Sequence, residues 1–407
     1  MLNQHFSSKN FMRLLTKQDI FRYEMGSGTD DYRAALNSVE EAIGKENFSF
    51  SEFGKKKMSH GDVITPKNIV DAFAIRKLND NIKRVFSIKP TDRNSILPQI
   101  KILLSEGGEF WLKKYDVAKF FESIPVNKAL EIINNDHRLS YESKRALDKL
   151  FTSQNLISKS GLPRGISLSS TISEIYMREF DRACRKLDNC YFYTRYVDDI
   201  LMLFHEDPGN LSLESLLPQG LSFHPEKTLT LHHQQRGPVK TSDGKSSVTY
   251  LGYEFNFVTP NKDKATKLEV GIAKKKIKKI KTRIILALTD YCTTRNYLLL
   301  KARLTFLASN YNIGRDAARG KLYAGVHFNH LLIDKERHDD LNDIDKFLCQ
   351  CICSKQGSLG RKLYPLLSMG ERRELMRISL MQGYQNKIVR NFKPERLLEI
   401  KRIWAHV

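Results

Sequence analysis

Residues 196–199 of this chain read Tyr-Val-Asp-Asp and lie within a run of aromatic and aliphatic residues. The flanking segments, 191–195 and 200–204, predict two strands joined by a tight turn. Two adjacent carboxylates in such surroundings are costly to bury unless cations neutralise them. The pattern therefore indicates a divalent metal site on a β-hairpin, and the alternative is a solvated turn, where aspartate is common.

The charge balance indicates a polyanionic partner. Lys and Arg outnumber Asp and Glu by 67 to 46 in 407 residues, for a formal net charge of +21, which favours nucleic acid first and a membrane surface second. No segment approaches the roughly 20 apolar residues of a spanning helix, and the first residues lack the apolar region of a secretory signal. We therefore expect a soluble, cytoplasmic protein of about two to three domains with no membrane partner.

The apolar periodicity divides the chain into a mixed part and a helical part. It predicts helices over 69–85, 95–104, 127–151 and 170–187, and strands over 110–117, 191–204 and 247–255. Beyond about 260 the pattern looks helical to the end, beginning with a lysine-rich segment that keeps an apolar stripe. A basic run at 55–57 and turn-like residues at 59–62 have no assigned role. The order suggests an α+β fold with an antiparallel sheet packed on helices, followed by an α-helical C-terminal region.

A second acid site lies at Asp116, which closes the strand over 110–117 just before a helix start. If this strand neighbours the hairpin in one sheet, Asp116 and Asp198 reach one point at its edge and, with a backbone carbonyl, hold two Mg²⁺ ions. Two ions about 3.5 to 4 Å apart clamp the attacking and leaving oxygens of a phosphoryl displacement. We therefore hypothesise nucleotidyl transfer; the alternative is that Asp116 caps the following helix.

Five motifs resemble, in the same order, those of reverse transcriptases. They are the acidic motif at 116–121, Gly-Leu-Pro-Arg-Gly-Ile-Ser-Leu-Ser at 161–169, Tyr-Val-Asp-Asp at 196–199, His-Pro-Glu-Lys-Thr at 224–228 and Tyr-Leu-Gly-Tyr at 250–253. The resemblance implies a right-hand polymerase. It places an N-terminal extension and fingers over 1–115, a palm over 116–258, and a helical thumb and C-terminal domain over 259–407.

For the chemistry, the resemblance implies that Asp116, Asp198 and Asp199 are catalytic acids that bind metal. Val117 adds its backbone to the metal and nucleotide sites, and Lys227 would protonate the pyrophosphate leaving group, as an ammonium can. A solvated lysine is the alternative for Lys227.

For the nucleotide, Phe121 takes the place of the family's steric gate against a ribose 2′-hydroxyl, so dNTPs are the expected substrates. Arg164 and Gly165 fall where the family contacts the incoming nucleotide and the template, although the family more often has Gln in place of Arg164. Cations are also expected over the triphosphate, against the alternative of a solvated helix face. The candidates are Lys83, Arg84, Lys89 and Arg93.

For the nucleic acid, Tyr250 and Gly252 belong to the strand pair that grips the primer in the family. Lys275, Lys278 and Lys279 lie on the lysine-rich helix and are expected to follow phosphates non-specifically, with a steep dependence on salt. The alternative is a solvated surface helix.

The compact frame resembles bacterial defence-associated reverse transcriptases, in particular the first polymerase of type 3 defence systems, at 79–84, 92–94, 306–311 and 323–326. This implies Mg²⁺ (or Mn²⁺), an RNA template in the form of a dedicated noncoding RNA, a DNA product, a second reverse transcriptase and a higher-order oligomer. Three alternatives stay open: an RNA polymerase, a template-independent or protein-primed polymerase, and a non-catalytic RNA-binding scaffold.

Overall fold

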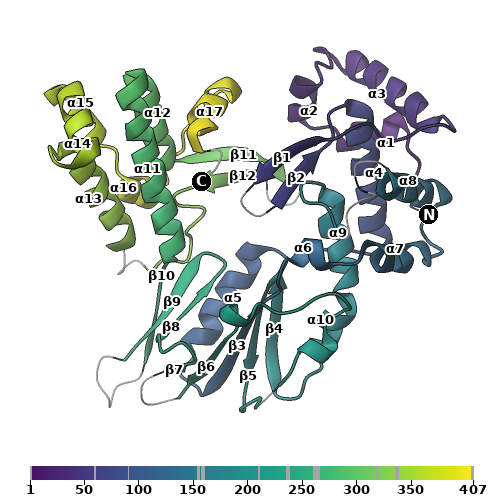
Figure 1. Cartoon of the computed structure of the whole chain (residues 1–407), viewed down its shortest axis with the longest axis horizontal. Coiled ribbons are helices and arrows are strands. Elements are labelled where there is room, and N and C mark those ends of the chain that lie inside the picture. Colours follow the sequence, from purple (N-terminus) through teal and green to yellow (C-terminus); the bar gives the residue numbers. More distant parts are fainter. Residues whose placement is uncertain are drawn as a thin grey trace. The chain divides into compact units, whose positions relative to one another are not determined.

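The computed structural model forms two compact units that are interleaved in sequence (Figure 1). The first comprises Met1–Asp92 and Phe110–Leu231, and the second comprises Arg93–Glu109 and His232–Val407. The residues described are 2–58, 61–89, 91–153, 156, 161–209, 211–234, 239–259, 266–316, 320–334 and 339–404, so residues 59 and 60 of the predicted turn lie outside them. The functional division at 115 and 258 stays a prediction.

The first unit combines an N-terminal group of helices with a sheet. Its helices are α1 (Ser8–Leu14), α2 (Lys17–Arg22), α3 (Thr29–Gly44), α4 (Ile69–Val85), α6 (Phe120–Ser123), α7 (Val126–Asn134), α8 (Tyr141–Thr152), α9 (Ser167–Tyr176) and α10 (Arg178–Cys184). Its strands are β1 (Gly54–Met58), β2 (Gly61–Thr65), β3 (Phe110–Asp116), β4 (Cys190–Tyr196), β5 (Asp199–Phe204) and β6 (Leu229–His233), which crosses the unit boundary. Strands β4, β5, β3 and β6 are neighbours in that order, and β5 is antiparallel to both β4 and β3.

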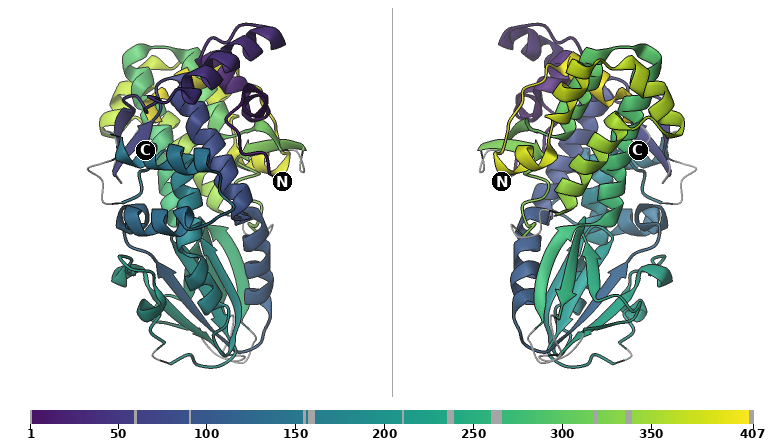
Figure 2. Two further views of the ribbon diagram at one scale, coloured as in Figure 1. Left: turned by 90° about the vertical axis from the view of Figure 1, so that its right-hand side faces the viewer. Right: turned by 90° about the vertical axis from the view of Figure 1, so that its left-hand side faces the viewer.

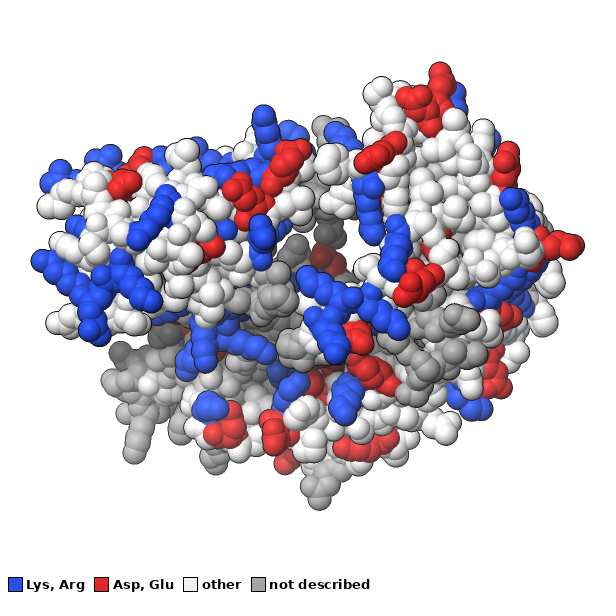
Figure 3. Space-filling model, turned by 45° about the horizontal axis from the view of Figure 1, so that its top comes forward, with Lys and Arg blue, Asp and Glu red and all other residues white. Residues whose placement is uncertain are grey.

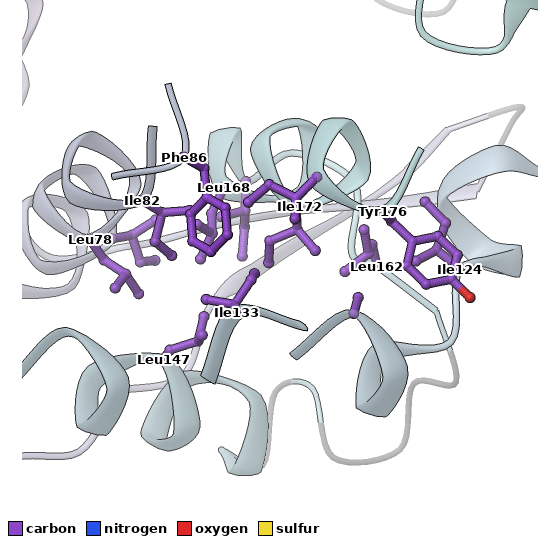
Figure 4. Close-up of a cluster of buried hydrophobic side chains, with 14 of the residues drawn as sticks. Leu78, Ile82, Phe86, Ile124, Ile133, Leu147, Leu162, Leu168, Ile172 and Tyr176 are labelled. Atoms are coloured by element: carbon purple, nitrogen blue, oxygen red, sulfur yellow. The ribbon is translucent and has the colours of Figure 1, made fainter. Parts of the chain in front are cut away.

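Helix α4 shows how this unit is held together. It begins after Asn68, whose side chain accepts a hydrogen bond from the Asp71 N–H (2.8 Å) and so caps the helix. Leu78 and Ile82 on its apolar face are fully buried and lie beside Leu168 and Ile172 of α9 (Figure 4). Each such side chain contributes about 1.5–3 kcal/mol when removed from water. The N-terminal helices and α9 therefore share one hydrophobic core.

The second unit holds the lysine-rich helix. Its helices are α5 (Arg93–Ser105), α11 (Lys274–Thr294), α12 (Tyr297–Leu307), α13 (Asp339–Cys353), α14 (Gly357–Leu363), α15 (Met369–Met376), α16 (Leu380–Gln385) and α17 (Pro394–Lys401). Its strands are β7 (Lys240–Thr241), β8 (Ser247–Tyr250), β9 (Tyr253–Val258), β10 (Lys267–Ile272), β11 (Asn310–Asp316) and β12 (Gly320–Gly325). The helices of this unit that follow residue 273 are green and yellow in Figure 2, and α11 packs against α12, α13 and α14. No helix among the described residues is long and apolar enough to cross a membrane.

The prediction of uninterrupted helices after 260 is wrong in three places. Strand β10 is antiparallel to β9, and β11 is antiparallel to β12. Glycines at 314, 320 and 325 disfavour a helix over the second pair. Strand β10 is stabilised by the edge of β9, a partner that a local periodicity does not reveal. The predicted helices and strands before 260 are observed, with 127–151 and 170–187 each divided into two helices. Among the described residues, seven α-helices and β-strands form where none was predicted: α1, α2, α3, β1, β2, β6 and β7.

Candidate active site

The strand that carries Asp116 is the direct neighbour of the strand that begins at Asp199. Asp116 and Asp199 face each other in the register of β3 and β5, and the Val117 N–H donates to the Asp198 carbonyl oxygen at 3.0 Å. The predicted adjacency of the two acid-bearing strands is therefore confirmed. Asp116 does not cap the following helix, because the N-cap of α6 is Lys119.

The turn that carries Asp198 is strained. Tyr196 pairs with Asp199, so Val197 and Asp198 are the two central residues of the hairpin turn, and Val197 has a φ of 60°. A positive φ at the first central residue alone is typical of a type II′ turn, where glycine is usual. A β-branched residue in this conformation costs on the order of 1–3 kcal/mol and persists only when its surroundings hold it.

Arg195 supplies part of that hold. Its guanidinium donates to the Val197 carbonyl oxygen at 3.0 Å and pairs with Glu174 on α9 (2.8 Å) and Asp181 on α10 (2.7 Å). The Arg195 side chain is only 3% exposed, and Tyr193 donates its hydroxyl to Asp181 at 2.6 Å. The hairpin is thus anchored to two helices by one buried cation. We did not predict Arg195 from the sequence, although its position directly before the Tyr-Val-Asp-Asp motif was a usable signal.

The surroundings of Asp198 and Asp199 make ionisation of their carboxyl groups less favourable. Burial, reinforced by the Asp116 charge, raises the pKa of Asp198. Burial raises the pKa of Asp199 to about 6; the Lys114 ammonium, 3.9 Å away, opposes this rise, and the charges of Asp198 and Asp116 add to it. Clustered carboxylates with this cost are suited to hard divalent cations. Among the described residues no three His, Cys, Asp or Glu side chains already form a metal-binding group, and the adjacent positive charge comes from Lys114 and Lys227.

Lys227 reaches the site through a backbone connection. The Ala118 N–H donates to the Ser222 carbonyl oxygen at 2.9 Å, and the His224 N–H donates to that of Asp116 at 2.8 Å. The following short helix, Pro225–Lys227, brings the Lys227 ammonium to 2.7 Å from an Asp116 carboxylate oxygen. The predicted lysine and the predicted acid are thus in contact.

Phe121 and Arg164 lie on two segments that press closely together. A Cβ on Gly161 would lie 2.1 Å from the Glu122 carbonyl oxygen, and a Cβ on Gly165, whose φ is +96°, would lie 2.3 Å from that of Ile64. Only glycine permits both approaches. The loop 161–165 therefore fits between α6 and β2, and Leu162 N–H donates to the Phe121 carbonyl oxygen at 2.7 Å.

The cations predicted over the triphosphate are divided between the two units. Arg84 pairs with Asp80 within α4 (2.9 Å), and Lys89 is exposed just after that helix. Lys83 is half-buried on α4. Arg93 belongs to the second unit and donates to the Leu251 carbonyl oxygen at 3.0 Å. Their role at the triphosphate stays a prediction.

A different set of cations lies beside the loop 161–165. Lys55, Lys56 and Lys57 are exposed on β1, whose partner β2 continues to the loop, where the Ile64 N–H donates to the Arg164 carbonyl oxygen at 2.9 Å. These lysines have no role predicted from the sequence. A basic run followed by turn residues and a β-branched segment was the signal for a hairpin that could have revealed them.

The predicted primer-gripping residues form a tight corner of the second unit. Leu251 and Gly252 connect β8 to β9. The side chain of Tyr250 is buried, with 1% exposed, so its ring is not available to a ligand at this corner. The Arg93 guanidinium lies over the Tyr253 ring at 5.1 Å. A Cβ on Gly252 would lie 3.1 Å from Cε of Lys276, so two cations border this corner.

The lysines of α11 fall on two sides of the helix. Burial, together with the charges of Lys279, Arg93, Arg283 and Lys275, lowers the pKa of Lys276, which marks a group of cations near the Gly252 corner. Lys278 instead lines a groove of about 430 Å³ whose other lining residues are Lys274, Ile277, Lys281, Thr282, Ile285 and Phe347. Lys275 and Lys279 therefore lie with the first group and Lys278 with the second. Figure 3 shows many Lys and Arg side chains on one face of the molecule, with Asp and Glu side chains among them.

His330 makes the second unit sensitive to acid. Burial, with repulsion from Arg93 and Lys276, lowers the pKa of His330 to about 4, below the 6.5 of an unfolded chain. The unfolded state therefore binds more protons between these values, and stability falls as pH falls. We expect wild type to lose about 2 kcal/mol between pH 7 and pH 5 relative to His330→Gln, measured by urea unfolding. His137→Gln, at an exposed site, should show no comparable difference, and equal losses in wild type and His330→Gln would contradict the prediction.

Acids from two adjacent strands and a lysine on the next segment meet at one end of an antiparallel sheet packed on helices, which is the arrangement predicted for the palm of a right-hand polymerase. Residues 64–255 match the family model described as reverse transcriptase (RNA-dependent DNA polymerase). This part of the chain, which contains Asp116, Phe121, Asp198, Asp199 and Lys227, is therefore a reverse transcriptase domain. No protein of curated function matches the chain in sequence.

Among solved structures, the chain is similar to telomerase from Candida tropicalis in complex with a fragment of telomeric RNA. The identity is 11%, the TM-score is 0.36, and the match covers 94% of this chain and 70% of that one. Telomerase from Candida albicans, also with a telomeric RNA fragment, is similar at 13% identity and a TM-score of 0.33, covering 81% of this chain and 53% of that one.

Proposed function

We propose that this chain is an RNA-directed DNA polymerase that adds dNTPs by nucleotidyl transfer. The observation that carries the proposal is the convergence of Asp116, Asp198 and Asp199 at one end of β3 and β5, inside a reverse transcriptase domain. Burial and mutual repulsion raise the pKa of Asp198 and Asp199, and a bound divalent cation would offset this cost of ionising them. Carboxylate and carbonyl oxygens suit Mg²⁺, and Mn²⁺ can substitute.

Each residue then has a chemical task. Asp116, Asp198 and Asp199, with the Val117 backbone, would hold two divalent ions, which when bound stabilise charge on the attacking and leaving oxygens. Lys227 would donate a proton to the departing pyrophosphate. Lys55, Lys56 and Lys57, on the hairpin that contacts the Arg164 loop, would add positive charge near the triphosphate, as phosphoryl-transfer enzymes require.

Primer extension on an RNA template tests this proposal. Purified protein with dNTPs and Mg²⁺ should extend an annealed primer, and EDTA should abolish the product. Reactions without template, and labelling of the protein itself by radioactive dNTP, distinguish template-independent and protein-primed synthesis. Extension with rNTPs alone would identify an RNA polymerase. RNA binding without incorporation under all these conditions would instead indicate a scaffold.

Phe121→Ala should relax the choice of sugar. The side chain extends from α6, partly buried against Phe120, with ring centroids 5.3 Å apart, and truncation would remove the steric clash with a 2′-hydroxyl. We expect the ratio of kcat/KM for dATP to that for ATP to fall by about tenfold or more. Phe120→Leu, a change in the buried ring of the same helix, should lower stability and keep the ratio. An unchanged ratio in Phe121→Ala would remove Phe121 from the sugar site.

We further propose a cytoplasmic role in bacterial antiviral defence, with a dedicated noncoding RNA as template and a second reverse transcriptase in a higher-order assembly. The support is the sequence resemblance at 79–84, 92–94, 306–311 and 323–326. Sequencing nucleic acid copurified with the wild type and with Asp198→Asn should yield one dominant RNA in both samples and its DNA copy in the wild type alone. A mixed RNA pool without a dominant species would contradict the dedicated template, and equal phage resistance with either protein would contradict a defence role for the activity.

A further inference from the structure

An ion pair between Glu122 and Arg164 joins helix α6, which carries Phe121, to the loop 161–165. Arg164 contacts the Glu122 carboxylate through Nε and, at 3.1 Å, through its second guanidinium branch. This two-pronged geometry fixes the guanidinium plane as well as its position. The Arg164 and Glu122 side chains are 33% and 39% exposed, so the pair remains open to ligands from solvent.

The pair lies where three parts of the candidate nucleotide site meet. Glu122 follows Phe121 directly, and the Arg164 charge acts on the Asp198 carboxyl. At the hairpin formed by β1 and β2, a Cβ on Gly61 would lie 3.4 Å from Glu122 Oε1 and 4.0 Å from Arg164 Nε. The guanidinium thus lies at the hairpin of β1 and β2, pairs with the residue that follows Phe121, and acts electrostatically on Asp198.

The energetics favour an exchange of partners at this position. A partly exposed ion pair of this kind contributes little to stability, because solvent screens it. A triphosphate offers several charges and oxygens in the forked geometry that a guanidinium prefers. The ion pair with Glu122 is therefore strong enough to orient Arg164, but it is too weak to keep Arg164 from pairing with a polyphosphate.

We propose that Glu122 is a positioning residue that holds Arg164 beside the nucleotide site and yields it to the triphosphate of the incoming nucleotide. The inference rests on the proposed function and extends it, because Glu122 competes directly with the substrate. It also accounts for the departure at this position, where an arginine stands in place of the family's usual glutamine. A charged guanidinium with its own acidic partner replaces a neutral amide.

Steady-state kinetics of the single and double variants test this inference. We expect Glu122→Gln to lower the KM for dNTP by about two- to fivefold with kcat unchanged, because the competing carboxylate is gone. Arg164→Gln should raise that KM by about tenfold or more, through loss of a charged contact. In the double variant the effect of Glu122→Gln should vanish, because Glu122 acts only through Arg164. A KM in Glu122→Gln that is unchanged or raised, or the same gain in the Arg164→Gln background, would overturn the inference.

Binding of inorganic tripolyphosphate, measured by calorimetry in metal-free buffer, separates this inference from the proposed function. If the wild type makes no DNA, the proposed function fails, while tighter tripolyphosphate binding by Glu122→Gln, about two- to fivefold, still supports the exchange of partners. Equal affinity in both proteins would overturn it. Glu179→Gln is the matched control, since it removes an exposed glutamate–arginine pair, with Arg182, on α10. Urea unfolding of each variant establishes that folded proteins are compared.

Discussion

The double replacement Asp198→Asn and Asp199→Asn is expected to lower the rate of dNTP incorporation by about a thousandfold or more. The two carboxylates would lose their charge at the turn where metal ions would bind, and each 1.36 kcal/mol of lost transition-state stabilisation is about tenfold in rate. Single-turnover primer extension on an RNA template measures the effect. Synthesis at the wild-type rate would remove these acids from the reaction.

The same variant should fold at least as well as the wild type. Since burial raises the pKa of both carboxyls, their ionised forms destabilise the native state above about pH 6, and neutral amides remove that cost. In EDTA at pH 8, urea unfolding should give a free energy equal to or about 1 kcal/mol above that of wild type. Glu206→Gln with Asp207→Asn, two exposed acids just beyond the other end of β5, is the matched control and should change neither quantity. A large loss of stability in the active-site variant would mean that the acids hold the fold.

Arg195→Leu is expected to lower the free energy of unfolding by about 3–5 kcal/mol. The change leaves the carboxylates of Glu174 and Asp181 near the protein interior without their shared cation, which is the costly way to break a buried ion pair. It also removes the donor to the Val197 carbonyl oxygen, so we expect the folded fraction to incorporate dNTPs more slowly. Chemical unfolding and single-turnover extension measure the two effects separately.

Arg182→Leu provides the comparison for that experiment. Arg182 also carries a glutamate partner, Glu179 at 2.8 Å, but both side chains are mostly exposed, so its loss should cost less than about 1 kcal/mol. Arg195→Lys tests the geometry, because an ammonium cannot reproduce the fork that reaches two acids and a carbonyl at once. Equal stabilities of Arg195→Leu and Arg182→Leu would contradict the anchoring role of Arg195.

Most of the α+β fold before residue 260 was predictable, because its apolar periods are local. Helix α4 and strands β3, β4 and β5 follow from spacings within a dozen or so residues. Strands β10, β11 and β12 were missed because a strand is stabilised by a partner elsewhere in the chain, and the periodicity of its own residues does not reveal that partner.

By itself, the sequence determined which residue types could carry the chemistry. The candidate residues were identifiable because each lies in a short motif whose order along the chain and residue types can be read from the sequence alone. They are Asp116, Phe121, Asp198 and Lys227. Only the tertiary structure decided the contacts around them. Arg195 donates to the turn at Val197, Glu122 pairs with Arg164, and the lysines of α11 are divided between two sides of the helix. These contacts depend on which distant segments pack together, as when Glu122 meets a residue 42 positions later. Burial and charge at such meeting points are properties of the folded chain.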